Sequence, residues 1–145
     1  MSVQQKLLHA MAELEKATAN PVTGSGQAWS QYVDKVLAEL EDALRRHAQE
    51  IAGADGQLVA VDRPLIPSPT LQHRGAHLAE ELHSILGQTQ SLRREFRELA
   101  PVANQPQREL FCQRARQLVQ DLERCESQEA DLIQDSVTTD IGAGD

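Results

Sequence analysis

Three side chains with metal-binding chemistry lie on two apolar stripes of the sequence. The first stripe has the spacing of a buried helix face and reads Val33, Leu37, Leu40, Leu44, His47, Ile51. The second reads Phe111, Ala115, Leu118, Leu122, Cys125, Glu129, Leu132. Residues three or four positions apart share one face of a helix, so the spacing predicts that His47, Cys125 and Glu129 face inward. Imidazole, thiolate and carboxylate are all ligands of transition metals, and helix bundles normally hold such sites in their cores.

The same three side chains also have a purely structural interpretation. A neutral His47 would hydrogen-bond Glu129, because buried polar groups need partners. Cys125 would pack as a small apolar residue, as free cysteines commonly do. Asp121 and Glu126 lie nearby in the sequence and would keep the pKa of the Cys125 thiol high, which is unfavourable for a reactive thiolate. The pattern predicts that His47, Cys125 and Glu129 lie together and leaves open whether they bind a metal.

The other histidines are weaker candidates. His73 and His77 share a helix face at i, i+4 spacing, but they flank the apolar stripe of their segment. His9 and His83 are also off their stripes, so all four are expected at the surface. No Ser/His/Asp or Cys/His arrangement has the local context of a nucleophile, and the sequence therefore predicts no enzyme.

Four helices are expected to carry these side chains, because breaks rich in Pro and Gly separate the periodic segments. They run from about Ser2 to Thr18, Ala28 to Ala52, Pro69 to Leu99, and Asn104 or Gln105 to Ser136. No strand is expected, and the long connection over 53–68 is predicted to be a packed crossing segment. The short connections force antiparallel neighbours. The predicted fold is all-α, an antiparallel up-down-up-down four-helix bundle over 1–136, followed by an acidic, flexible tail over 137–145.

The predicted core of this bundle comes from the inward stripes of the last three helices. Its members are Leu37, Leu40, Leu44, Leu78, Leu82, Ile85, Leu118 and Leu122. The stripe of the third helix is expected to stay inward as far as Leu99. Cys112 and Cys125 lie ~20 Å apart on the fourth helix at ~1.5 Å rise per residue, beyond disulfide reach, so both are expected to be free thiols.

Composition excludes several classes of function. The chain of 145 residues is long enough for one domain with a continuous core. Its formal net charge of −8 argues against a nucleic-acid partner, because phosphate binding needs clustered basic side chains. No run reaches the roughly 18 apolar residues of a membrane span, and the N-terminus lacks the pattern of a signal peptide. We therefore expect a cytoplasmic protein that binds neither nucleic acid nor a membrane.

The C-terminal part of the chain carries a family resemblance. The segment 122–133, followed by Asp140-Ile141-Gly142, resembles the last helix of hemerythrin-like (HHE cation-binding) domains. The segment from Pro69 to Leu82 resembles the third helix of bacterial members, and the segment from Trp29 to His47 resembles their second helix. This resemblance implies a four-helix bundle that holds a non-haem diiron centre with histidine and carboxylate ligands.

Carried over position by position, the resemblance implies an incomplete set of ligands. His47 and Glu129 match ligand positions. Ile51 stands where the family has a carboxylate, and Leu82 and Cys125 stand where it has histidines. The first helix offers no clear match. Three departures at ligand positions are hard to reconcile with two bound irons.

The sequence therefore predicts a hemerythrin-like bundle that has lost its diiron centre and binds no cofactor. Such a protein would act as a non-enzymatic binding or regulatory protein, with another protein or a second copy of the chain as its partner. The alternative is a remnant cation-binding or redox- or oxygen-sensing protein. In that case His47, Cys125 and Glu129 would hold iron or another transition metal.

Overall fold

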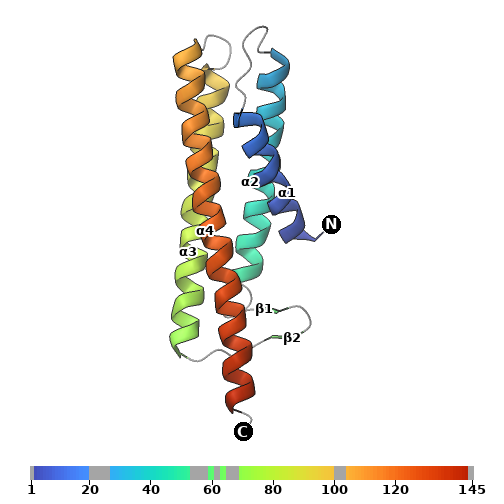
Figure 1. Ribbon diagram of the computed structural model, residues 1–145, viewed down its shortest axis with the longest axis vertical. Helices are drawn as coiled ribbons and strands as arrows, with labels where there is room; N and C mark the ends of the chain where they lie inside the picture. The colour runs from blue at the N-terminus through green and yellow to red at the C-terminus, as the bar shows by residue number, and fades with distance from the viewer. Residues whose placement is uncertain are drawn as a thin grey trace.

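The computed structural model is a bundle of four long helices (Figure 1). It describes residues 2–19, 27–52, 59–60, 63–64, 69–99 and 104–143. The helices are α1 (Val3–Ala19), α2 (Gln27–Ala52), α3 (Pro69–Leu99) and α4 (Gln105–Ala143). Two short strands, β1 (Val59–Ala60) and β2 (Arg63–Pro64), lie between α2 and α3.

Successive helices run in opposite directions along the bundle (Figure 1). Each helix packs against the next, and α1 also packs against α4, which closes the ring of four. This arrangement confirms the predicted all-α, up-down-up-down bundle. Helix α1 is the shortest of the four and begins partway along the bundle (Figure 1). None of the described helices combines the length and the apolar character needed to cross a membrane.

The core follows the periodicity of the sequence closely. The eight predicted core residues, from Leu37 to Leu122, are all buried. The stripes of α2 and α4 are buried along their whole predicted length, including their polar members. The stripe of α3 is buried as far as Phe96, but Leu99 is 41% exposed, so its expected inward position is wrong. Leu99 is the last residue of α3, where the helix no longer has neighbours on every side.

Two helix starts are stabilised by reciprocal side-chain caps. At α1, Ser2 Oγ accepts from the Gln5 backbone N–H at 3.1 Å, and Gln5 Oε1 accepts from the Ser2 backbone N–H at 2.9 Å. At α4, Asn104 and Gln107 exchange the same pair of bonds at 3.0 and 2.9 Å. Such capping boxes satisfy donors that have no partner within the helix. They therefore determine where α1 and α4 begin.

The structure corrects the sequence prediction in two places outside the core. Strands β1 and β2 form an antiparallel pair with Val59 opposite Pro64, although no strand was expected. The rest of the expected crossing segment lies outside the described residues. The expected end of the last helix near Ser136 is also wrong, because α4 continues to Ala143. No Pro or Gly lies between Ser136 and Gly142, so the sequence there does not break the helix.

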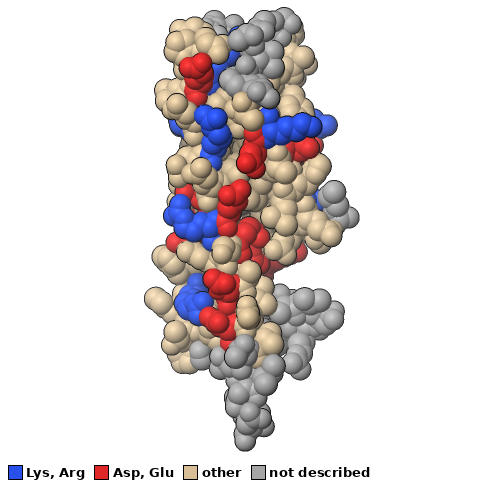
Figure 2. All heavy atoms as spheres, in the orientation of Figure 1, with Lys and Arg blue, Asp and Glu red and all other residues tan. Residues whose placement is uncertain are grey.

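The basic residues near the end of α3 alternate with acidic residues and form ion pairs with α2. Arg93 and Arg97 both bind Asp34 of α2, at 3.2 and 2.9 Å, and Arg93 also reaches Glu41 at 3.3 Å. Figure 2 shows acidic and basic side chains interspersed over the face that it displays. The exposed pair of Arg97 with Asp34 contributes little to stability, about 0–1 kcal/mol.

Candidate functional site

The inward histidine of α2 meets an inward glutamate of α4. His47 is 3% exposed and Glu129 is 7% exposed, so both side chains are buried in the bundle. His47 Nε2 lies 2.8 Å from Glu129 Oε2, within hydrogen-bonding distance. This confirms the contact that the two stripes predict. It also places the site close to the end of α2.

A second glutamate of α4 completes the cluster. Glu126 Oε1 lies 3.3 Å from His47 Nε2. One ligand atom from each of His47, Glu126 and Glu129 lies within 4.8 Å of the others, the one such group with three metal-binding residues in the described part of the chain. We call these three residues the His47 cluster. Glu126 was not among the predicted site residues, although its i, i+3 spacing from Glu129 puts both on one face of α4.

Helix α1 reaches the cluster through its first turn. Gln4 Nε2 donates a hydrogen bond of 3.0 Å to Glu126 Oε2. Glu50 lies on the other side of the imidazole, with its Oε2 3.9 Å from His47 Nδ1, too far for a hydrogen bond. Within the described residues, His47 Nδ1 and Glu126 Oε1 are buried and make no hydrogen bond of good geometry. The cluster therefore joins three helices and keeps two polar atoms unsatisfied.

The charge of His47 differs from the sequence expectation. Burial acts to lower its pKa, but the close contacts with the carboxylates of Glu126 and Glu129 and their negative charge outweigh it and raise the pKa to about 10. The raised pKa favours the imidazolium form of His47 at neutral pH over the neutral ring expected from the sequence. Burial acts to raise the pKa of Glu126, but the close contact with His47 and the hydrogen bond from Gln4 outweigh it, so that pKa is lowered and Glu126 is ionised.

Cys125 is buried beside the cluster but does not belong to it. Its Sγ donates to Glu81 Oε2 of α3 at 3.5 Å, so the thiol faces α3. Glu81 Oε1 in turn binds His77 at 2.9 Å. The structure thus brings together two of the three predicted site residues, and Glu126 takes the place expected for Cys125.

The thiol chemistry of Cys125 is that of a protonated hydrogen-bond donor. Burial first, and then the hydrogen bond to Glu81, raise the pKa of Cys125 to about 12. The sequence also predicted a high pKa but attributed it to Asp121 and Glu126. A thiol with this pKa is a poor nucleophile and a poor metal ligand at neutral pH, because both roles need the thiolate. Cys112 is likewise buried and free, as expected.

The remaining positions that the family resemblance marks as ligands are filled by hydrocarbon. Leu82 is 1% exposed and packs in the core, and Ile51 is also buried. Neither side chain has an atom that can coordinate a metal. Diiron bundles use about six protein ligands, whereas the His47 cluster supplies three. The residues present therefore do not fit a diiron centre, although three ligands suffice for a single cation with an open position.

The four other histidines, His9, His73, His77 and His83, are all exposed, as their off-stripe positions predict. The His47 cluster is thus the candidate site that the structure supports. No protein-family model matches the chain, and neither do any curated proteins or solved structures.

Proposed function

We propose that this chain is a hemerythrin-like bundle that has lost its diiron centre and acts as a non-enzymatic binding or regulatory protein. The observation that carries this proposal is the buried hydrocarbon at the implied ligand positions. Leu82 and Ile51 are packed in the core. Apolar packing stabilises a bundle without metal, whereas a metal-dependent domain gains much of its folding free energy from the ion.

The protonation of His47 supports the same proposal. Two buried carboxylates would be costly side by side unless a positive charge lay between them. The imidazolium of His47 supplies that charge, at 2.8 Å from Glu129 and 3.3 Å from Glu126. The bundle can therefore keep these polar groups in its interior without a cation.

The titration behaviour of His47 and Cys125 supports a non-enzymatic role. A general base works best when its pKa lies near the working pH. His47, with a pKa of about 10, holds its proton too tightly for that role. Cys125, with a pKa of about 12, is a protonated thiol and not a nucleophile.

Metal analysis of the protein purified without an affinity tag tests this proposal. We expect a colourless protein with far less than one iron per chain. Its melting temperature should not change when an iron chelator is added. Two irons per chain, with the absorption bands of an oxo-bridged pair, would overturn the proposal.

A second candidate function is the binding of a single divalent cation by the His47 cluster. The convergence of three ligand atoms within 4.8 Å favours it. Metal ligands must be deprotonated, so a cation would displace the proton from His47. Binding should then release about one proton, which calorimetry in two buffers of different ionisation enthalpy measures.

The calorimetric experiment uses Zn²⁺ and Mn²⁺ with metal-free protein and two variants. Glu126→Gln should abolish binding if the cluster is the site. His77→Ala is the matched control, because His73 and His77 form a surface pair that can bind metals on its own. Binding that survives Glu126→Gln but disappears in His77→Ala would exclude the cluster as a cation site.

A further inference from the structure

The end of the bundle opposite the His47 cluster gathers three of the four aromatic residues of the chain. The rings of Trp29 and Phe96 lie 5.8 Å apart, those of Trp29 and Phe111 lie 6.5 Å apart, and those of Phe96 and Phe111 lie 4.5 Å apart. Trp29 lies eighteen residues before His47 on α2, which corresponds to ~27 Å at ~1.5 Å per residue. The aromatic cluster is therefore a separate region from the His47 cluster.

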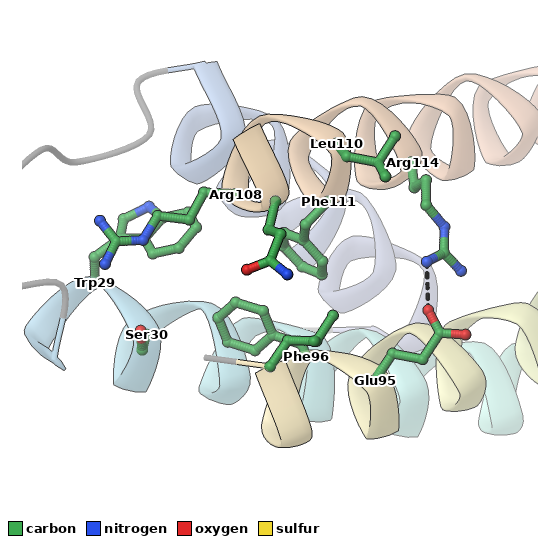
Figure 3. A pocket seen from close by; sticks show the side chains of 10 residues that line it. Trp29, Ser30, Glu95, Phe96, Arg108, Leu110, Phe111 and Arg114 are labelled. Atoms are coloured by element: carbon green, nitrogen blue, oxygen red, sulfur yellow. Dashed lines mark hydrogen bonds and ion pairs between the residues drawn. The ribbon is translucent and has the colours of Figure 1, made fainter. Parts of the chain in front are cut away.

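A cavity of about 210 Å³ lies against these three rings (Figure 3). We call it the aromatic pocket. Its other apolar walls are Leu99, which is 41% exposed, and Leu110, which is 57% exposed. Both side chains border the same open space beside the three rings. The walls thus offer an apolar surface to a ligand.

The rim of the aromatic pocket carries an excess of positive charge. Arg108 and Arg114 of α4 line it, together with a single acidic residue, Glu95 of α3. Arg114 donates a hydrogen bond to Glu95 (Figure 3). A guanidinium has five N–H donors, so Arg114 can keep this bond and still bind another carboxylate. The rim is cationic on a chain whose formal net charge is −8.

We infer that the aromatic pocket binds a small amphipathic organic anion, an apolar body with one carboxylate. The body lies against Trp29, Phe96 and Phe111, and the carboxylate binds Arg108 and Arg114. The cavity is smaller than the roughly 300–1,000 Å³ of pockets for drug-sized ligands, which favours a single ring or a short alkyl chain. This site goes beyond the proposed function, because the metal content of the His47 cluster would leave it unchanged.

Trp29 makes the inference directly testable. It is the only tryptophan of the chain, so tryptophan fluorescence reports from the pocket wall alone. The probe is octanoate, and its uncharged counterpart, 1-octanol, tests the role of the carboxylate. We expect octanoate to change the Trp29 emission saturably, with unchanged helical circular dichroism. Octanol should bind about tenfold more weakly, since it loses a charge-assisted hydrogen bond.

Matched variants assign the binding to the pocket. Arg108→Gln should weaken octanoate binding by about tenfold, for the same reason as the loss of the ligand charge. Arg116→Gln, an exposed arginine on the same helix that does not line the cavity, should leave binding unchanged. Leu110→Asp should also weaken binding, whereas Leu8→Asp, at an exposed leucine of α1, should not.

Three results would overturn the inference. The first is the absence of a saturable change in Trp29 emission with octanoate. The second is equal binding of octanoate and octanol, which would remove the role of the arginines. The third is a dimer in sedimentation that buries Leu110 and persists in octanoate, because a second copy of the chain would then occupy this surface.

Discussion

At the His47 cluster, inward polar side chains are paired with one another, whereas at the aromatic pocket the inward side chains are apolar and leave a space. The cluster lies between three helices that pack closely, and its imidazolium is held by two carboxyl groups of α4. The pocket lies where α2 and α4 begin and α3 ends, so its walls are the last turns of the bundle. In one region the charged groups contact one another inside the bundle, and in the other charged and apolar side chains line a cavity at the end of the bundle.

This difference indicates where each kind of function can reside in one bundle. A charge that is paired within the protein contributes to the folded structure and is costly to disturb. At the pocket, two guanidinium groups with five N–H donors each lie beside an apolar cavity, so they can bind a ligand and keep their other partners. We therefore expect mutations at the His47 cluster to change stability, and exposed mutations at the pocket to change binding with little change in stability.

A large loss of stability is expected from Glu129→Ala. It removes the nearest partner of a buried imidazolium, and breaking such a pair costs about 3–5 kcal/mol in free energy of unfolding. Glu126 remains beside His47, so the loss should lie near the lower value. Urea denaturation measures it, with Glu123→Ala, at an exposed residue of the same helix, as a control that should change stability by less than about 0.5 kcal/mol.

The combined variant His47→Leu, Glu126→Gln, Glu129→Leu distinguishes the cost of leaving a buried charge without its partner from the cost of burying the charged cluster as a whole. Replacing a whole buried ion cluster by apolar side chains is often neutral or stabilising by about 1–4 kcal/mol. We expect it to recover most of the stability that Glu129→Ala loses. A combined variant that is less stable than Glu129→Ala would show that the cluster stabilises the fold beyond its internal pairing.

Truncation of a core leucine should lower the free energy of unfolding more than truncation of a leucine at the aromatic pocket. Leu82→Ala should lower the free energy of unfolding by about 2–5 kcal/mol, because Leu82 is 1% exposed and the cavity left behind cannot close fully. Leu110→Ala should change it by less than about 0.5 kcal/mol, because its side chain is mostly exposed. Comparable losses in the two variants, measured in urea, would contradict the distinction between the two regions.

The parts of the fold that were predictable from the sequence are those set by helical periodicity. The spacing of His47 and Glu129 on their stripes determines which faces they share with the core, and their contact follows once α2 and α4 are neighbours. Phe111, which lies on the predicted stripe of α4, is also buried. These relations depend on neighbours along one helix and on the order of the helices.

The parts that were not predictable depend on side-chain reach and on packing between helices. Glu126 lies one position beside the stripe, and its long side chain carries the carboxylate inward to His47. Cys125 lies on the stripe, but the nearest polar group on α3 draws its thiol toward Glu81. Sequence spacing places a Cα on a face of the helix, but the partner across the interface decides where the functional atom lies.

The pH dependence of stability should report the charge of His47. Its pKa of about 10 in the folded protein exceeds the ordinary value of 6.5 expected for the unfolded chain. The resulting stabilisation is fully present below pH 6.5 and is lost as the pH rises through 10. Over that range the free energy of unfolding should fall by up to about 1.4 kcal/mol per pH unit.

His47→Gln isolates this effect from the titration of other groups. We expect the stability difference between the wild-type protein and His47→Gln to shrink steadily between pH 6.5 and 10, in the presence of a metal chelator. A difference that stays constant over this range would mean that His47 is neutral in the folded protein. Glu126 and Glu129 would then need another source of positive charge.

The smallest expected effect concerns the link between the His47 cluster and α1. Gln4→Ala removes the donor that binds Glu126 Oε2 at 3.0 Å. This bond is exposed, so water can replace it, and the loss should be about 0.5–1.5 kcal/mol in free energy of unfolding. Gln120→Ala, at an exposed residue of α4, is the control.

Because the Gln4 bond also lowers the pKa of Glu126, Gln4→Ala should lose slightly more stability at neutral pH than at pH 3, where the Glu126 carboxyl is closer to its protonated form. A loss that is the same at both pH values would show that Gln4 holds α1 in place without acting on the charge of the cluster.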